Sequence, residues 1–293
     1  MLTLDKIYHA AFVLKDVARK TDLIEAPKLS KDCQLYLKTE NLQATGSFKV
    51  RGAYYKISTM SSDEREKGLI TASAGNHAQG VAYAAKLYGV PATIVMPTTT
   101  PLIKVNRTKG YGANVVLHGS VYDEACQKAL ELAEKSGATF VHPFNDETVA
   151  TGQGTIAMEI FKELPTVDII LVPIGGGGLA AGVSTLAKLL NPNIKVIGVE
   201  PAGASCMKAS LDAGKVVTLP NVETIADGTA VKTPGDKIFP YIQKNIDEII
   251  AVEDEELIVN FLDILENHKM LVENSGLLTA VSYTHLTLPT KRI

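Results

Sequence analysis

Short apolar runs alternate with longer amphipathic stretches along most of this chain of 293 residues. The apolar run 69–73 precedes a stretch of small residues at 77–88, which is closed by a glycine and a proline. The same order returns with the apolar run 168–174, an amphipathic stretch at 179–190 and the apolar run 195–200. Uniformly apolar strands that alternate with helices are typical of parallel sheets covered by helices on both faces. We therefore expect an α/β fold of two such units, with no linker marking a boundary between them.

Composition and charge narrow the class of protein. The chain has 29 Lys and Arg against 32 Asp and Glu, so the formal net charge is −3, and no dense basic run indicates a nucleic-acid partner. No apolar run reaches the ~18 residues of a membrane span, and the N-terminus lacks the apolar core of a secretory signal. Cys33, Cys126 and Cys206 are odd in number and far apart. We expect neither disulfides nor a cysteine zinc site, in a cytoplasmic protein.

A run of four glycines, Gly175 to Gly178, separates a predicted strand from a predicted helix. Consecutive glycines leave backbone N–H groups unobstructed, and a helix N-terminus adds partial positive charge, so this turn is suited to a phosphate. A tight strand–helix turn is the simpler interpretation, but such a turn rarely needs four adjacent glycines. The same segment fits G-x-G-x-x-A, with Glu200 closing the next strand. Taken alone, that pattern favours an NAD-dependent oxidoreductase.

Two upstream segments carry side chains suited to amino-acid chemistry. Lys49 follows a Thr-Gly-Ser turn and an aromatic residue. Most lone lysines are solvated surface charges, yet a desolvated lysine readily forms a Schiff base with a carbonyl compound. The segment Ser73-Ala74-Gly75-Asn76-His77 ends a predicted strand, where open α/β sheets bind ligands. Its hydroxyl, amide and helix N-terminus suit a carboxylate, and a helix start capped by Ser73 or Asn76 explains the same residues equally well.

Together these segments resemble the fold-type II pyridoxal-phosphate enzymes, a family that includes threonine and serine dehydratases, serine racemase and cysteine synthase. The resemblance covers about residues 5–280 and is closest to the threonine ammonia-lyases. Several matches in the right order are more specific than any one of them, so they outweigh the nicotinamide interpretation. The matching segments are 46–53, 73–80, 141–144, 152–155, 175–179 and 226–231.

The resemblance implies a two-lobed fold similar to that of tryptophan synthase β, each lobe an open, mostly parallel sheet with helices on both faces. Residues 1–45 and 146–281 would form a large cofactor-binding lobe, C-terminally incomplete, and residues 46–145 a small lobe with the substrate loop. Residues 282–293 do not match the family and are interpreted as a tail of foreign, chimeric origin. The implied partners are pyridoxal 5′-phosphate and a small amino acid, with no nucleic acid or membrane, in a homo-oligomeric intact parent.

The resemblance also assigns roles to individual residues. It implies that Lys49 binds the cofactor aldehyde and later acts as the base on the substrate Cα–H, with Phe48 beside the cofactor ring. Asn76 would contact the phenolic oxygen of the ring, and Ser73, Asn76 and His77 would receive the substrate carboxylate. The remaining cofactor contacts would come from Gly175, Gly176, Gly177, Gly178 and Leu179, through backbone N–H groups to the phosphate, and from Gly228.

The expected reaction is α,β-elimination from L-threonine, and from L-serine, giving ammonia with 2-oxobutanoate or pyruvate. Serine racemase is the alternative within the family, but Ala74 stands where racemases tend to carry a second serine. We expect no metal: Glu200 and Ala204 resemble a divalent-cation site of some relatives, but Cys206 replaces the later acid and a solvated strand-end acid explains Glu200 as well. A catalytically inactive binding protein is the alternative that the altered tail suggests.

Overall fold

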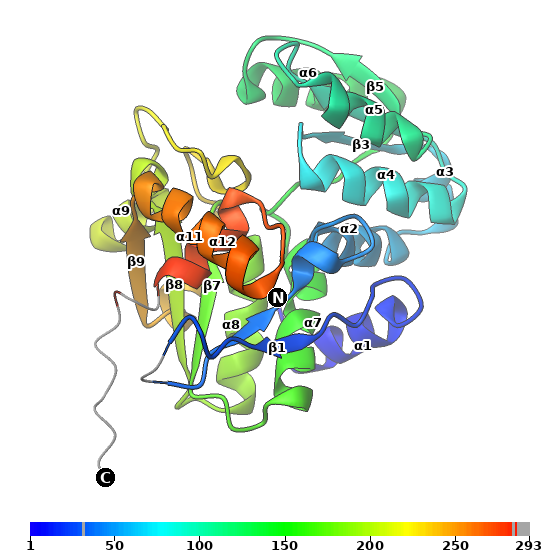
Figure 1. Cartoon of the computed structure of the whole chain (residues 1–293). Helices are drawn as coiled ribbons and strands as arrows, with labels where there is room; N and C mark the ends of the chain where they lie inside the picture. Colours follow the sequence, from blue (N-terminus) through cyan, green and yellow to red (C-terminus); the bar gives the residue numbers. More distant parts are fainter. Residues whose placement is uncertain (31–32, 283–284, 286–293) are drawn as a thin grey trace. The chain divides into compact units, whose positions relative to one another are not determined.

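The computed structural model describes residues 1–30, 33–282 and 285 (Figure 1). Parallel strands alternate with helices along the chain, and the predicted α/β class is confirmed. Within these ranges, the helices are all too short or too polar to cross a lipid bilayer. The chain divides into two compact units, Met1–Lys20 with Leu42–Thr155 and Thr21–Asn41 with Ile156–Ile293.

The borders of the two units differ from the predicted lobe borders. Residues 1–20, 42–45 and 146–155 group with the middle of the chain, whereas the prediction placed them in the large lobe. Packing explains part of the difference, because the N-terminal helix contacts the helix that begins at Lys49. The assignment of the lobes stays a prediction. The predicted unrelated tail, 282–293, lies outside the described residues apart from Ser282 and His285.

A four-stranded parallel sheet forms the centre of the first unit, in the order β5-β4-β3-β6. Its strands are β3 (Leu69–Ala72), β4 (Ala92–Met96), β5 (Asn114–Leu117) and β6 (Thr139–Phe140). The helices are α1 (Leu4–Leu14), α2 (Lys49–Ser58), α3 (Ser62–Glu66), α4 (Asn76–Tyr88), α5 (Leu102–Gly110), α6 (Tyr122–Ser136) and the start of α7 (Glu147–Glu163).

Alternate residues of this sheet enter two different cores, as the two-residue period of a strand requires. Leu69 and Ile94 pack with α2 and α4. Ile70 and Val95 pack with α6 through Ala125 and other small residues. The strands are therefore apolar throughout because both of their faces are covered, which is why the sequence showed continuous apolar runs.

The second unit is built on a three-stranded parallel sheet in the order β7-β8-β9. Helices α11 and α12 and strands β8 and β9 share one apolar core, while α8 contacts β7 and β8. An antiparallel pair, β1 (Leu23–Glu25) with β2 (Tyr36–Lys38), belongs to the same unit and was not predicted. The other elements are β7 (Ile169–Pro173), β8 (Lys195–Pro201), β9 (Glu248–Val252), α8 (Gly178–Leu190), α9 (Cys206–Ala213), α10 (Phe239–Asn245), α11 (Asp254–His268) and α12 (Asn274–Ser282).

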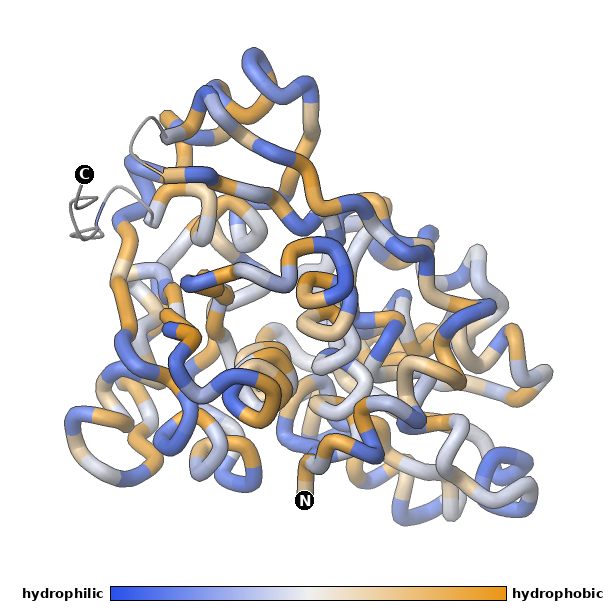
Figure 2. The backbone as a smooth tube through the Cα atoms, turned by 90° about the horizontal axis from the view of Figure 1, so that it is seen from below, coloured by the Kyte–Doolittle hydropathy of each residue, from blue (hydrophilic) through white to orange (hydrophobic). Residues whose placement is uncertain are grey.

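Hydrophilic and hydrophobic residues alternate along the helices of both units (Figure 2). In α6, for example, Ala125 and Ala129 are buried one turn apart. Gly137, in the left-handed conformation with φ 72°, ends that helix. The helices predicted at 77–88 and 179–190 agree with α4 and α8 within one residue at each end.

Candidate active site

Lys49 opens helix α2 and is not a solvated surface lysine. Its Nζ donates a hydrogen bond to the carbonyl oxygen of Pro143 at 3.0 Å and lies 5.3 Å from the centre of the Phe48 ring. The chain reaches Lys49 through Gly46, whose φ of 77° suits glycine. Lys49 and Phe48 are both half-buried. The first unit thus presents an amine that is partly desolvated and already directed by an acceptor.

Two glycines let neighbouring helices approach the first turn of α2 closely. A Cβ atom on Gly80 of α4 would lie 3.1 Å from the carbonyl carbon of Lys49, and one on Gly152 of α7 would lie 2.7 Å from the carbonyl oxygen of Arg51. Gln153, next to Gly152, accepts the N–H of Gly52 through Oε1 at 3.1 Å. The 152–155 match in the sequence is therefore explained by packing, because it holds the turn that carries the lysine.

The Arg51 side chain is 1% exposed and makes hydrogen bonds inside the first unit. It donates to Thr155 Oγ1 at 3.2 Å and to the carbonyl oxygen of Arg19 at 3.3 Å. Gln43 Oε1 accepts the Arg19 N–H at 2.6 Å, and Gln43 Nε2 donates to the Arg19 carbonyl oxygen at 2.8 Å. A buried guanidinium with such partners fixes the register of α2 against α7. Sequence reasoning missed this residue as a part of the site.

The predicted substrate loop begins where β3 ends. Ser73 Oγ accepts the N–H of Gly75 at 3.2 Å, and Ser73 and Asn76 are half-buried. Helix α4 follows with Gly75 as its N-cap and with no side-chain cap, so the interpretation of Ser73 or Asn76 as a helix cap is wrong. A glycine N-cap leaves the partial positive charge of the helix N-terminus available to a ligand.

His77 is buried at the start of the same helix. Its Nε2 donates to the carbonyl oxygen of Val141 at 3.0 Å. Burial, followed by the nearby charge of Lys49, lowers the pKa of His77 to about 3, so the ring is neutral. Nδ1 is then an acceptor, and it is buried with no hydrogen-bond partner among the described residues. An acceptor repels a carboxylate, so a contribution of His77 to substrate binding comes from its backbone N–H.

The glycine run belongs to the second unit and joins β7 to α8. Gly177 has φ 97°, is the N-cap of α8 and leaves that helix without a side-chain cap. A Cβ atom on Gly177 would lie 2.7 Å from Met207 Cε, and one on Gly175 would lie 3.0 Å from the Cα of Thr229. Packing and conformation thus account for two of the glycines. A backbone free of side chains at a helix N-terminus fits a phosphate.

Gly228 lies in the loop 226–231 that packs against the glycine run. A Cβ atom on Gly228 would lie 2.9 Å from the hydroxyl oxygen of Ser275, the second residue of α12. That hydroxyl also lies 3.3 Å from Thr229 Oγ1 and is buried. Ser275 was not among the predicted residues. Its signal in the sequence is a small hydroxyl residue within Asn274-Ser275-Gly276, at the start of a helix.

Glu200 is fully buried, so the interpretation of this residue as a solvated strand-end acid, one of the two left open by the sequence, is wrong. Its carboxylate accepts the backbone N–H groups of Met207 and Lys208, each at 2.8 Å, where α9 begins. Burial raises its pKa to about 7 although those hydrogen bonds oppose the shift. Cys206 is also buried, with its sulfur 3.9 Å from the carbonyl oxygen of Gly175. In the described part of the chain, no group of three or more His, Cys, Asp or Glu residues is placed to hold a metal ion.

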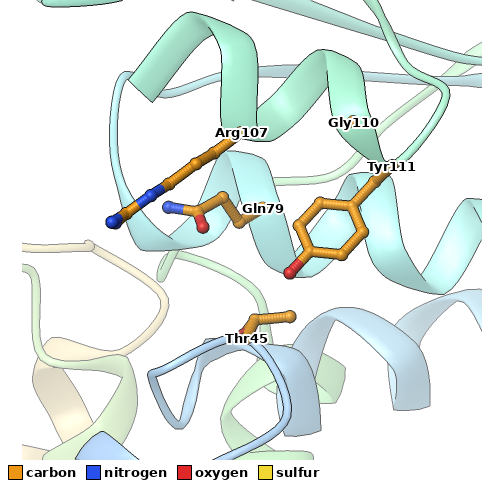
Figure 3. A pocket seen from close by; sticks show the side chains of 5 residues that line it. All are labelled: Thr45, Gln79, Arg107, Gly110 and Tyr111. Atoms are coloured by element: carbon orange, nitrogen blue, oxygen red, sulfur yellow. The ribbon is translucent and has the colours of Figure 1, made fainter. Parts of the chain in front are cut away.

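A separate pocket of about 410 Å³ lies within the first unit (Figure 3). Thr45 contributes to it from the turn before Lys49, and Gln79 from helix α4. Arg107 and Tyr111 extend toward it from α5 and the residue that follows α5 (Figure 3). The turn that leads to the lysine therefore lines this pocket together with the cationic side chain of Arg107.

The residues of each unit suit one part of a phosphorylated aldehyde. The first unit offers a half-buried amine, an adjacent aromatic ring and an uncapped helix N-terminus. The second offers a glycine turn that excludes side chains and a further uncapped helix N-terminus. An amine binds a carbonyl carbon covalently, and helix N-termini bind anions. The donor set therefore fits pyridoxal 5′-phosphate.

Comparisons with known proteins agree. The family model described as pyridoxal-phosphate dependent enzyme matches residues 14–290. The chain is 50% identical over 278 residues to the L-threonine ammonia-lyase of Thermotoga maritima, covering 94% of this chain and 69% of that protein. It is 44% identical over 281 residues to a catabolic L-threonine dehydratase of Staphylococcus aureus, covering 95% and 81%.

Solved structures give the same answer. The processed form of threonine deaminase isoform 2 from Solanum lycopersicum superimposes with a TM-score of 0.91 at 42% identity, covering 97% of this chain and 86% of that one. Maize serine racemase superimposes with a TM-score of 0.93 at 35% identity, covering 95% and 85%. The family match favours a pyridoxal-phosphate enzyme over the NAD-dependent oxidoreductase, and the role of the glycine run stays a prediction. This chain belongs to the family of pyridoxal-phosphate dependent enzymes.

Proposed function

We propose that this chain is an L-threonine ammonia-lyase, which converts L-threonine to 2-oxobutanoate and ammonia and L-serine to pyruvate and ammonia. The observation that carries the proposal is the half-buried Lys49 amine, which donates to the Pro143 carbonyl oxygen at 3.0 Å. Lys49 lies on a helix, α2, whose N-terminal turn is tightly packed. The 50% identity to an L-threonine ammonia-lyase supports the choice of substrate. When bound, pyridoxal 5′-phosphate supplies an electron sink for the charge left on Cα.

In this proposal the residues of the first unit handle the substrate. Lys49 Nζ would hold the cofactor and, once free of it, would take the proton from Cα of the substrate. The Ser73 hydroxyl and the backbone N–H groups of Asn76 and His77 bind the carboxylate, which the uncapped start of α4 favours. The Asn76 amide would hold the phenolic oxygen of the cofactor, and Phe48 would lie beside its ring.

The residues of the second unit hold the phosphate end of the cofactor in this proposal. The N–H groups of the run Gly175 to Gly178 and of Leu179, at the start of α8, would donate to the phosphate. Gly228 lets the loop 226–231 approach, because a side chain there would meet Ser275. We propose that the two units serve as the small and the large lobe. A cytoplasmic location and a homo-oligomeric assembly are further proposals that rest on the resemblance.

Serine racemase is the second candidate function, and the similarity of this chain to the structure of maize serine racemase supports it. Racemisation returns a proton to Cα from the face opposite the lysine, which requires a second acid. Ala74 has no ionisable group at the position where racemases tend to carry a serine. Elimination needs no such acid, so the alanine favours the lyase.

The test is a pair of lysine variants, Lys49→Ala and Lys49→Arg, each purified and incubated with pyridoxal 5′-phosphate. We expect the unmodified chain to show a visible absorbance band, to carry a borohydride-fixed label on Lys49, and to release 2-oxobutanoate from L-threonine. Both variants should lose the band, the label and the product. Turnover by Lys49→Ala would overturn the assignment of the lysine. Formation of D-serine from L-serine faster than pyruvate would favour the racemase.

A further inference from the structure

The segment after β6 is fixed at its first residue, Val141. The Val141 N–H donates to the carbonyl oxygen of Ile70 on β3 at 2.7 Å. Its own carbonyl oxygen accepts His77 Nε2 at 3.0 Å and Thr71 Oγ1 at 2.7 Å. Three hydrogen bonds to one buried residue leave little freedom for the turn that follows it.

His142 closes that turn through its ring. Nδ1 accepts the backbone N–H groups of Phe144 at 3.2 Å and of Asn145 at 2.9 Å. The ring also makes edge contacts with Phe140 and Phe144, at centre distances of 5.9 and 4.8 Å. Acceptance of the N–H groups two and three residues onward is the geometry by which Asn and Asp close turns. Between His142 and the groups it bonds lies Pro143, whose carbonyl oxygen accepts Lys49 Nζ.

A second contact ties the far end of the segment to the lysine helix. Lys56 stands seven residues after Lys49, on the same side of α2, and forms an ion pair with Asp146 at 2.8 Å. Asp146 Oδ1 also accepts the N–H groups of Thr148 and Val149 at the start of α7. Burial opposes ionisation of Asp146, but the hydrogen bond and charge of Lys56 keep its pKa below the ordinary value. The Pro143 carbonyl thus lies in a segment that is fixed at both ends against α2.

We propose that the Pro143 carbonyl oxygen holds the Lys49 amine whenever that amine is not bonded to the cofactor, and that His142 is the positioning residue for this carbonyl. The proposal rests on the proposed function of Lys49. It assigns a role to the 141–144 match, which the functional assignment above leaves without one.

A carbonyl oxygen suits this task in both protonation states of the amine. It accepts an N–H from the neutral amine, whose lone pair stays available for the Cα proton, and it accepts an N–H from the ammonium ion after that proton has moved. Without an acceptor, a lysine side chain samples many rotamers of its four-carbon stem. The Pro143 carbonyl oxygen therefore keeps the Lys49 amine within reach of the substrate from the moment the amine leaves the cofactor until it takes the Cα proton.

Two substitutions at His142 separate the acceptor from the ring. His142→Asn keeps an acceptor, because Asn Oδ1 and His Nδ1 are the same number of bonds from Cα, but it loses the aromatic contacts. His142→Phe keeps a ring for Phe140 and Phe144 but has no acceptor. The measurements are kcat and KM for L-threonine, and the rate at which the apo-protein develops its visible band on addition of pyridoxal 5′-phosphate. Borohydride labelling of Lys49 in each protein is the control.

We expect H142F to lower kcat about ten-fold, the upper end of the effect of losing one ordinary hydrogen bond, with KM within about two-fold. The band should also form more slowly in H142F, and H142N should stay close to the unmodified chain in both measurements. Equal defects in the two variants, or an unimpaired H142F, would overturn the proposal. Should H142F not fold, His142→Leu replaces it under the same criteria. Absence of the Lys49 label from the unmodified chain would instead refute the proposed function.

Discussion

Three glycines in helices give a graded test of how tightly the lysine helix is held. A Cβ atom on Gly152 would lie 2.7 Å from backbone atoms of Arg51 and Gly52, and one on Gly80 would lie 3.1 Å from the backbone of Lys49. Gly110, the last residue of α5, has nothing within 4 Å of a Cβ atom. The substitutions Gly152→Ala, Gly80→Ala and Gly110→Ala therefore add the same methyl group to increasingly open sites.

The expected magnitudes follow from these distances. Ordinary contact begins at 3.4 Å, so Gly152→Ala overlaps backbone by about 0.7 Å and Gly80→Ala by about 0.3 Å. Overpacking costs roughly 1–3 kcal/mol, against a gain of about 1 kcal/mol for alanine in a helix. Gly152→Ala should lower the free energy of unfolding by about 2 kcal/mol, Gly80→Ala should leave it nearly unchanged, and Gly110→Ala should raise it by about 0.5–1 kcal/mol.

Activity should respond more strongly than stability. A methyl group on Gly152 or Gly80 moves the turn that carries Lys49, and a misplacement of about 1 Å at a reacting group costs roughly a hundred-fold in rate. We expect about a ten-fold or greater loss of kcat for Gly152→Ala, a few-fold loss for Gly80→Ala and none for Gly110→Ala. Urea unfolding of the apo-proteins and turnover of L-threonine measure both quantities. If Gly152→Ala unfolds and turns over like Gly110→Ala, the packing argument for the lysine helix is wrong.

Two further predictions concern buried carboxylates of the second unit. Burial raises the pKa of Glu200 to about 7, so the folded chain binds the proton of Glu200 more tightly than the unfolded chain does. The contribution of this proton to the free energy of unfolding is complete below pH ~4.5 and is lost as the pH rises to about 7. Glu200→Gln should flatten that slope in urea titrations at several pH values. Lys38 and Glu159 form an ion pair at 2.7 Å with side chains 9% and 18% exposed. Lys38→Met should cost about 3 kcal/mol, and adding Glu159→Leu should restore part of it; additive effects in a double-mutant cycle would contradict this.

The fold could be predicted where the sequence carries a period. The strands of both parallel sheets are covered on two faces, and that leaves apolar runs such as 69–72 and 169–173 with glycine or proline beside them. The antiparallel pair of β1 and β2 could not be predicted in the same way. Its strands have three residues each and are mostly exposed or half-buried, so no alternation distinguishes them from loops.

The site shows the same division between local and long-range signals. Lys49, the loop from Ser73 and the glycine run stand out because turn residues and helix starts mark them along the chain. Arg51 and Ser275 do not, since their roles depend on partners 104 and 46 residues away. Glu200 was misjudged for this reason: a strand-end acid is usually solvated, and only the start of α9 folding over it buries the carboxylate.

Several polar groups of α2 are bonded to one neighbouring segment of the chain. Arg51 and the Gly52 N–H are bonded from α7, Lys56 is bonded by the residue before α7, and the lysine amine itself is bonded by the turn that leads into α7. Each of these bonds joins α2 to a single continuous segment that starts at β6. Because a desolvated polar group without its partner costs more than a bond contributes, every one of them penalises the same displacement of α2. Apart from the bond to Lys49 itself, the contacts that provide this rigidity involve no residue placed at the substrate.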